Sequence, residues 1–334
     1  MKGTLMVSLD FELFWGMLDC STLEAYQDHV LGGRKAIPKL LELFRKYDIH
    51  ATWAAVGFLF GENREELAKF FPMEKPSYAD QKLNPYIWFD RIGKNEEEAP
   101  CFYGASLLRQ IAEVPGQEIG SHTFCHYYCR EKGQSVEEFA QDMQAAKAIA
   151  GHHGYDVTSV ILPRNQCVPE YTQVLRECGF TAYRDEENDW IHNKIKFRPL
   201  LRLLRLADVY LPLTGQGGFV PVKENGIWNL VGSRMYKPIL KPLEFLEGLK
   251  LRRIKKQMLH AAKKGLTFHL WWHPHNVGVR TEEHLAQLDE IFRYYEELKE
   301  KYGMRSLNMR EMTEEMNTKQ AQITMKYGLQ EPEV

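Results

Sequence analysis

Short apolar segments alternate with amphipathic ones along most of this chain. Strand-like apolar segments occur at 4–11, 50–60, 117–126, 158–163, 180–184, 266–273 and 305–309. Between them, apolar residues recur every three or four positions, which predicts helices over 36–44, 106–112, 135–150, 169–179, 243–264 and 285–298. Strands that alternate with helices predict a parallel sheet covered by helices, arranged either as a barrel or as a doubly wound sheet.

Two stretches interrupt this alternation. Residues 61–104 and 185–242 are irregular and rich in Pro, Gly or polar residues, and we interpret both as insertions. Pro38 is expected in an early turn of its helix, where proline is tolerated. Residues 1–315 are expected to form a single domain. The polar residues 316–334 are expected to form a frayed tail.

Polar residues collect where the predicted strands end. Five groups, each after a different strand, are Asp10 and Glu12; His122 and His126; Arg164 and Asn165; Arg184 and Asp185; and His273, His275 and Asn276. In both candidate architectures the carboxyl ends of the strands meet at the functional face. We therefore expect these groups to lie close together.

The two histidines of His122-Thr-Phe-Cys-His126 are spaced so that both imidazoles can reach one metal ion. A catalytic site of this type needs a third protein ligand and an open position for water. Asp10 and Glu12 are two apart on a strand and face the same way, so one can bind metal while the other acts as a base. Which of the two binds metal stays open, as does the alternative that the histidines are ordinary surface or capping residues.

Composition narrows the function classes. The chain has 334 residues, 44% hydrophobic, and a net charge of −2, which argues against a nucleic-acid partner. It contains no apolar run of about 18 residues, the length that a membrane span requires. The first residues lack the features of a signal peptide, so we expect a cytoplasmic protein. Its six scattered cysteines are expected to be reduced.

Taken in order, the motifs resemble those of the polysaccharide deacetylases, metal-dependent carbohydrate N-deacetylases with a distorted (β/α) barrel. VSLDFE (7–12) resembles the family's acidic motif, and ATWAAVG (51–57) resembles its second strand. EIGSHTFCH (118–126) is similar to the H-[ST]-x-x-H motif, with one extra residue between the histidines. LPRNQ (162–166) resembles the Arg-Pro motif in reversed order, and WWHPHN (271–276) resembles the last strand with its histidine. These departures indicate a divergent member, closer to deacetylases of surface-glycan biosynthesis than to chitin deacetylases.

The resemblance implies roles for individual residues. Glu12, His122 and His126 would hold a divalent metal, zinc by default. Asp10 would be the general base, with Arg164 beside it, and His273 would be the general acid. The substrate contacts that we expect are Asn165, His275, Asn276 and Trp190, which lies on a loop and could stack on a sugar. Trp15 and Trp272 are expected in the core.

The near-zero net charge hides a basic segment. Residues 193–264 contain 16 Lys or Arg against 4 Asp or Glu. This segment is either a solvated helix face or a patch for anionic headgroups or a nucleotide diphosphate sugar. The second interpretation places the protein at the inner membrane face, in peripheral contact through 193–264.

The predicted function is metal-dependent removal of an N-acetyl group from a sugar in a glycan or its precursor, free or linked to a nucleotide or lipid. Two alternatives stay open. One is hydrolysis of a cyclic amide or ureide on the same fold. The other is a non-catalytic protein that binds a membrane surface or a glycan.

Overall fold

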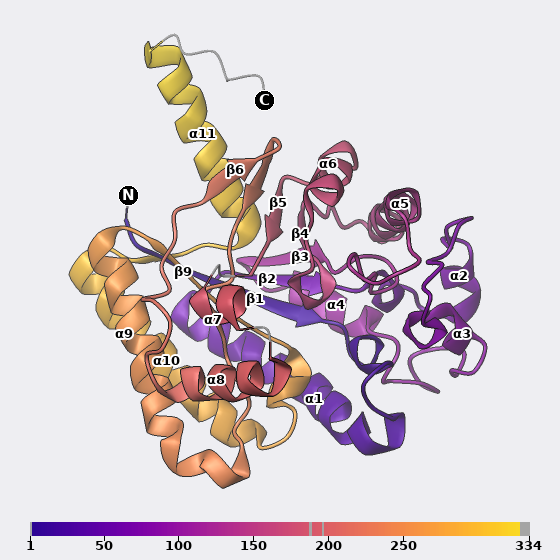
Figure 1. The fold of residues 1–334 in the computed structure, drawn as a ribbon, viewed down its shortest axis with the longest axis horizontal. Helices are drawn as coiled ribbons and strands as arrows, with labels where there is room; N and C mark the ends of the chain where they lie inside the picture. The colour runs from indigo at the N-terminus through magenta and orange to yellow at the C-terminus, as the bar shows by residue number, and fades with distance from the viewer. Residues whose placement is uncertain (1, 187–188, 196, 328–334) are drawn as a thin grey trace.

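A row of mostly parallel strands, surrounded by helices, forms the centre of the molecule (Figure 1). The computed structural model describes residues 2–186, 189–195 and 197–327. The strands lie in the order β6-β7-β5-β4-β3-β2-β1-β9-β8, and β10 pairs with the start of β1. Their bounds are β1 Thr4–Phe11, β2 Ala51–Ala55, β3 Gln117–Ser121, β4 Ser159–Ile161, β5 Ala182–Arg184, β6 Val222–Glu224, β7 Ile227–Asn229, β8 Arg234–Met235, β9 Thr267–Trp272 and β10 Arg305–Ser306.

One short segment, residues 230–236, contacts two strands that lie far apart in this row, β5 and β9. Its Leu230 N–H donates to the Tyr183 carbonyl of β5 (2.8 Å), and its Tyr236 N–H donates to the Trp271 carbonyl of β9 (2.8 Å). The same few residues therefore lie against β5 on one side and β9 on the other. The predicted α/β fold of the distorted-barrel type is confirmed.

Eleven helices are present in the described residues, most of them packed around the strands (Figure 1). They are α1 Leu23–Tyr47, α2 Arg64–Ala68, α3 Tyr86–Phe89, α4 Ala105–Ala112, α5 Val136–His152, α6 Pro169–Glu177, α7 Trp190–Lys194, α8 Arg198–Tyr210, α9 Glu247–Lys264, α10 Thr281–Tyr302 and α11 Met309–Tyr327. Short 3-10 turns follow several strands, among them η1 (Trp15–Met17), η4 (Pro163–Asn165) and η6 (Pro274–Val277). No helix in the described ranges is both long and apolar enough to cross a membrane.

Several sequence expectations are corrected by these elements. α1 begins at Leu23, so Pro38 lies in its middle rather than in an early turn. The stretch 61–104 contains α2 and α3, and the stretch 185–242 contains α7, α8 and three strands, so neither is irregular throughout. α11 continues to Tyr327, so the predicted tail is helical rather than frayed up to that residue, and 328–334 lie outside the described residues.

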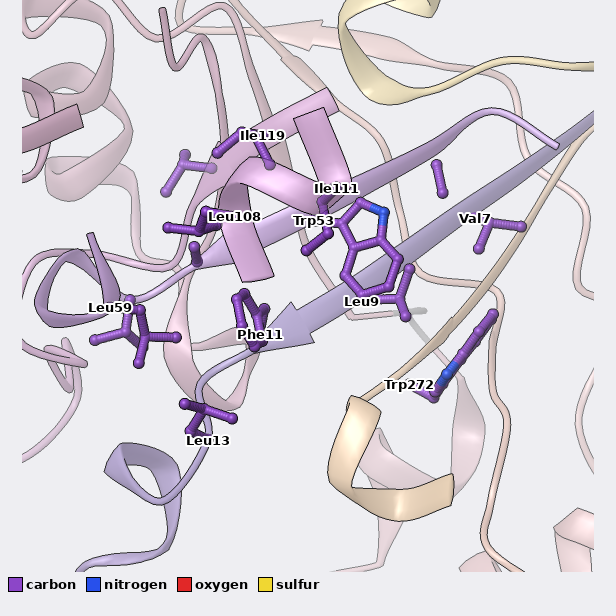
Figure 2. Packing of buried hydrophobic residues seen from close by; sticks show 14 of the residues in the cluster. Val7, Leu9, Phe11, Leu13, Trp53, Leu59, Leu108, Ile111, Ile119 and Trp272 are labelled. Carbon is purple, nitrogen blue, oxygen red and sulfur yellow. The ribbon is translucent and has the colours of Figure 1, made fainter. Parts of the chain in front are cut away.

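Alternation along β1 separates two apolar cores. Leu5, Val7, Leu9 and Phe11 face the helices and belong to the larger core, in which Leu9 and Phe11 lie near Trp53 and Trp272 (Figure 2). The even-numbered residues face the interior of the barrel, because successive side chains of a strand point to opposite faces. Met6 is part of a small inner core that α11 completes with Met309 and Met312.

Above Met6 the barrel interior is polar. Ser8 Oγ lies 2.8 Å from His269 Nε2 and accepts a hydrogen bond from Arg184 (2.9 Å). His269 is fully buried and also contacts the Leu230 carbonyl, so it is a core histidine with both ring nitrogens engaged. Asp10, the next inward residue of β1, therefore ends a polar column that leads out of the barrel at its carboxyl end.

The basic segment 193–264 is only partly solvated. In α9, Lys250 and Arg253 are buried, and they pair with Glu247 and Asp208, respectively. The other basic residues of α9, among them Arg252, Lys256, Lys263 and Lys264, are exposed, in agreement with a solvated helix face. Burying a charged side chain requires a partner, and the chain supplies one each for Lys250 and Arg253.

Candidate metal centre and active site

A cavity of about 280 Å³ opens where the carboxyl ends of the parallel strands meet. It is lined by residues from four of the five polar groups, together with the aromatic rings of Tyr26 and Trp271. The polar lining residues are Asp10, Glu12, His126, Arg164, Asn165, His273, His275 and Asn276. The expectation that these scattered residues lie close together is therefore met by the fold.

Glu12 and two histidines form a buried cluster at one side of this cavity. Glu12 Oε2 lies 3.0 Å from His126 Nε2 and 3.3 Å from His122 Nε2, and all three side chains are at least 95% buried. Ligand atoms around a tetrahedral zinc ion, at bond lengths near 2.1 Å, are separated by about 3.4 Å. The three residues therefore present a carboxylate and two imidazoles at the spacing that such an ion requires.

The protonation states of the cluster also suit a cation. Burial would raise the pKa of Glu12, but the surrounding imidazoles hold that pKa well below its usual range. Burial lowers the pKa of His126, which keeps its imidazole neutral despite the nearby carboxylate. Metal ligation requires an ionised carboxylate and neutral imidazoles, so this donor set fits a divalent metal.

The turn after β1 leaves room for the Glu12 carboxylate. Gly16, in η1, lies directly against it, and a β-carbon at position 16 would overlap the carboxylate atoms. The Trp15 N–H donates to the Glu12 carbonyl (3.0 Å), which folds η1 back onto the end of the strand. Glycine at position 16 therefore allows Glu12 to face the histidines.

Asp142 of α5 fixes the loop that carries the two histidines. Its carboxylate accepts the backbone N–H groups of Phe124 (2.7 Å) and Cys125 (3.1 Å). Within the loop, Thr123 and His126 adopt left-handed backbone conformations, with φ of 65° and 63°. Such conformations are costly for residues other than glycine, and they persist only where surrounding contacts hold them. The Asp142 contacts supply that support, a role that the sequence analysis did not assign.

Asp10 is paired with Arg184, not with Arg164. The Arg184 guanidinium donates two hydrogen bonds of 2.7 Å to the two carboxylate oxygens of Asp10, and both side chains are buried. Burial alone would raise the pKa of Asp10, but Arg184 lowers it below its ordinary value. Asn165 Oδ1 accepts two further hydrogen bonds from Arg184 (3.0 and 2.9 Å), so it orients the guanidinium.

Arg164 lines the same cavity but points elsewhere. It forms ion pairs with Asp19 and Glu131, and its guanidinium lies 4.2 Å from the centre of the Tyr128 ring. The prediction that Arg164 lies beside Asp10 is therefore wrong in its geometry. The left-handed backbone at Arg164 (φ 57°) carries the side chain to the cavity rim, whereas β5 carries Arg184 into the barrel.

His273 lies across the cavity from the cluster. Its Nε2 is 3.7 Å from Asp10 Oδ2 and 3.6 Å from Glu12 Oε1, and its side chain is 20% exposed. Its Nδ1 lies 3.2 Å from Asn276 Oδ1, which favours the tautomer with the proton on Nδ1. His275 stacks on the His273 ring (5.0 Å between centroids), and burial lowers the pKa of His275 to about 3.

Close packing of α1 positions these histidines. A β-carbon on Gly33 would lie 2.9 Å from the His275 α-carbon, and one on Gly32 would overlap the Gly278 backbone. The two glycines let the helix touch the backbone of η6. This contact packs η6, the turn directly after His273, against α1.

Known proteins resemble this chain both in sequence and in fold. The family model for polysaccharide deacetylase matches residues 26–183, nearly half of the chain. A Mycobacterium smegmatis protein named as a polysaccharide deacetylase superposes with a TM-score of 0.59 at 12% identity, covering 96% of this chain and 92% of its own. A Pseudomonas aeruginosa PAO1 protein named for the same family gives 0.53 at 11% identity, with 98% and 93% covered. The chain is therefore similar in sequence to the polysaccharide deacetylases over residues 26–183, and similar in fold to both of these proteins.

Two further comparisons define the limits of this relationship. The allantoinase Puue superposes with a TM-score of 0.53 at 13% identity, covering 93% of this chain and 88% of its own. No curated protein sequence matches the chain. The family match includes His122 and His126, but it begins after Asp10 and Glu12 and ends before β9, so the placement of these two acids and of His273 rests on the structure.

The aromatic residues of the chain are only partly where the sequence analysis expects them. Trp15 and Trp272 are buried in the core, as expected. Trp190 is 42% exposed and donates to the Leu213 carbonyl (2.8 Å), and it is not among the residues that line the cavity. Trp271 lines the cavity instead, 4.2 Å from the Arg184 guanidinium, and the sequence analysis did not single it out.

Proposed function

We propose that this protein is a metal-dependent hydrolase that removes an N-acetyl group from a sugar. One observation carries the proposal: the Glu12, His122 and His126 cluster shares a cavity with an ionised Asp10 and with His273. His273 Nε2 lies 3.7 Å from Asp10 Oδ2 and 3.6 Å from Glu12 Oε1, so the cavity combines a metal site, a base and an acid, which is what amide hydrolysis requires.

Glu12, His122 and His126 would hold the metal, and zinc suits a donor set of two imidazoles and one carboxylate. When bound, such an ion polarises the amide carbonyl and lowers the pKa of an attacking water. Asp10 accepts the proton of that water as its oxygen bonds to the carbonyl carbon. Arg184 holds the Asp10 carboxylate in place through its two hydrogen bonds.

With a proton on each ring nitrogen, His273 would complete the reaction by giving its Nε2 proton to the amide nitrogen while Nδ1 keeps its proton. The C–N bond then breaks, and the products are acetate and the amino sugar. Asn276 holds the His273 Nδ1 side of the ring, which leaves Nε2 directed toward Asp10 and Glu12. His275 stacks beside it and limits its rotation. Asn165 acts through Arg184 and is a positioning residue rather than a substrate contact.

A second cavity beside the first could hold an anionic carrier group attached to the sugar. This cavity, of about 190 Å³, shares Asn165, Met235 and Trp271 with the first. Arg205 and Lys237 line it, although Asp208 and other acidic side chains also contribute. Nearby, α8 exposes Leu203 (62%) beside its arginines, a combination typical of helices that lie at a membrane surface.

These features support a phosphate-linked N-acetyl sugar as the substrate, carried by a lipid at the cytoplasmic membrane face. Sedimentation with anionic vesicles at low salt tests the membrane contact. Leu203→Glu should abolish co-sedimentation if α8 forms the contact. Co-sedimentation that survives this substitution would show that α8 does not form the contact. No co-sedimentation by the unchanged protein would show that it does not bind an anionic membrane surface.

Acetate release tests the proposed reaction. A panel of N-acetyl sugars, free, nucleotide-linked and lipid-linked, is incubated with the protein before and after chelation and zinc restoration. We expect release that chelation abolishes and zinc restores. Asp10→Asn should lose turnover and keep its metal. Release that is insensitive to chelation, or none from any substrate by zinc-loaded protein, would overturn the proposal.

Structural similarity to an allantoinase supports a second candidate, hydrolysis of a cyclic amide or ureide in the same cavity. A panel of such compounds, assayed with the same zinc-loaded protein, separates the two. Ring opening without acetate release would favour the second candidate.

A further inference from the structure

A second group of two histidines and a glutamate lies outside the cavity. Glu66 belongs to α2, His152 is the last residue of α5, and His153 follows it. Glu66 Oε1 is 3.3 Å from His152 Nε2 and 3.2 Å from His153 Nε2. The ligand atoms of all three residues lie within 4.8 Å of one another. The mechanism proposed above uses none of them.

Hydrogen bonding does not account for this convergence. His153 Nε2 is buried and has no hydrogen-bond partner among the described residues, although the Glu66 oxygen is nearby. A buried polar atom without a partner is costly, so such an atom calls for an explanation. The two N···O distances are close to the separation of about 3.4 Å expected for ligands of a tetrahedral zinc ion. A cation between the three atoms would satisfy His153 Nε2.

Neighbouring contacts fix the orientation of these ligands. The other carboxylate oxygen of Glu66 accepts the Glu62 N–H (2.6 Å), and the Glu66 N–H donates to Asn63 Oδ1 (2.9 Å), which caps α2. The His152 ring packs 5.3 Å from the Phe70 ring. The glutamate is thus held at the start of one helix and the histidines at the end of another.

Electrostatics also favours a cation at this position. The last carbonyl groups of a helix give its C-terminus a partial negative charge of about half an elementary charge. His152 and His153 lie at the C-terminus of α5, and the Glu66 carboxylate adds a full negative charge beside them. Because His152 is 57% exposed, the site is open to solvent and to exchange with free ions.

We propose that Glu66, His152 and His153 bind a second divalent cation of the zinc class, with water completing the coordination. Its role is structural: it ties α2, in the 61–104 stretch, to the end of α5. The site is independent of the proposed deacetylase activity, because no residue of this group lines the catalytic cavity.

Metal counting on the full-length protein tests this inference with zinc alone as the probe. After loading with zinc and removal of the excess, we expect two equivalents in the unsubstituted protein and one in His126→Asn. The double variant His126→Asn, His153→Asn should contain none. His260→Asn, which removes a histidine of α9 outside both groups, is the matched control and should retain two.

A substitution at the exposed His152 guards against misfolding. His152→Ala should lose one equivalent of zinc while keeping the circular dichroism spectrum and acetate turnover of the unsubstituted protein. Zinc should raise the melting temperature of His126→Asn but not that of the double variant. A zinc content of His152→Ala and His153→Asn equal to that of the unsubstituted protein would overturn the inference, and this result is distinguishable from a failure of acetate release.

Discussion

The chain brings a glutamate and two histidines together twice, with nearly the same spacing and very different surroundings. In the inner cluster the N···O distances are 3.0 and 3.3 Å, and in the outer cluster they are 3.2 and 3.3 Å. The inner cluster is buried beside Asp10, Arg184 and His273, whereas His152 of the outer cluster is 57% exposed. The ligands alone therefore do not make a catalytic site. The proposed base and acid, Asp10 and His273, lie beside the first cluster and distinguish it from the second.

The backbones that carry the clusters differ as well. His126 and Thr123 hold left-handed conformations in a loop supported by Asp142. His152 and His153 simply end a regular helix. Strained backbone conformations cluster at functional sites, and they persist only where surrounding contacts offset their conformational energy. The inner cluster thus lies on strained backbone, whereas the outer cluster lies on regular backbone where two helices meet.

The largest expected effect separates the two clusters directly. His126→Ala should reduce acetate turnover about 1,000-fold or more, because several kcal/mol of transition-state stabilisation depend on the cation. His153→Ala should leave turnover within about twofold. Steady-state acetate release at saturating zinc measures both. Equal losses in the two variants would remove the distinction between a catalytic and a structural cluster.

Substitution of Arg184 tests whether the inner cluster depends on the paired Asp10 carboxylate beside it, a feature that the outer cluster lacks. Arg184→Met leaves Asp10 buried without its partner, so we expect a loss of about 3 to 5 kcal/mol in the free energy of unfolding and a large fall in turnover. Arg164→Met breaks only partly exposed ion pairs and should cost less than about 1 kcal/mol. Urea unfolding of both variants provides the measurement. A larger loss from Arg164→Met would contradict the assignment of Arg184.

Gly16 tests the shape of the inner cluster without removing a ligand. Gly16→Ala should displace the Glu12 carboxylate and lower turnover about 100-fold, because small displacements at a catalytic centre have effects of this size. Gly248→Ala in α9, where a β-carbon meets no atom within 4 Å, is the matched control. It should leave turnover unchanged. Full activity in Gly16→Ala would show that Glu12 tolerates another position.

The smallest effect on the free energy of unfolding is expected for His50 and Glu311, a histidine–glutamate pair with no second histidine beside it. His50 Nδ1 lies 2.7 Å from Glu311, and this carboxylate raises the pKa of His50 above 6.5. A pKa raised by folding stabilises the protein below pH 6.5, and this contribution is lost as the pH rises through the folded-state value. His50→Gln should therefore lose about 0.5 to 1 kcal/mol at pH 5.5 and little at pH 8.5 in urea unfolding. The same loss at both pH values would show that the pair does not depend on the proton.

Periodicity predicted the fold well because buried strands alternate with amphipathic helices along the chain. The site was harder to predict from the sequence than the fold, and the predictions succeeded for some residues and not for others. Glu12, His122 and His126 meet because strand ends converge, which the order of motifs anticipates. Arg184 was noted at a strand end without a role, since a sequence does not show which of two arginines enters a barrel.

Other features leave no pattern along the chain. Glu66 is far from His152 and His153 in sequence, and only the packing of α2 against the end of α5 brings them together. Asp142 resembles any acidic residue of a helix, although its carboxylate accepts two loop amides. Trp190 was favoured because it lies in a polar stretch, but the helix α7 places its indole against a backbone carbonyl. Each error comes from a tertiary contact that local sequence does not encode.

The pairing of β1 has a consequence for how the protein is made. One neighbour of β1 is β2, close behind it in sequence, while the other is β9, which begins at Thr267. During synthesis from the N-terminus, one edge of β1 therefore has no partner until most of the chain has left the ribosome. Late pairing of this kind slows folding and exposes an edge that can pair with other chains. A chain that stops before Thr267 should aggregate rather than accumulate as an inactive domain, and chaperone demand should fall sharply once β9 emerges.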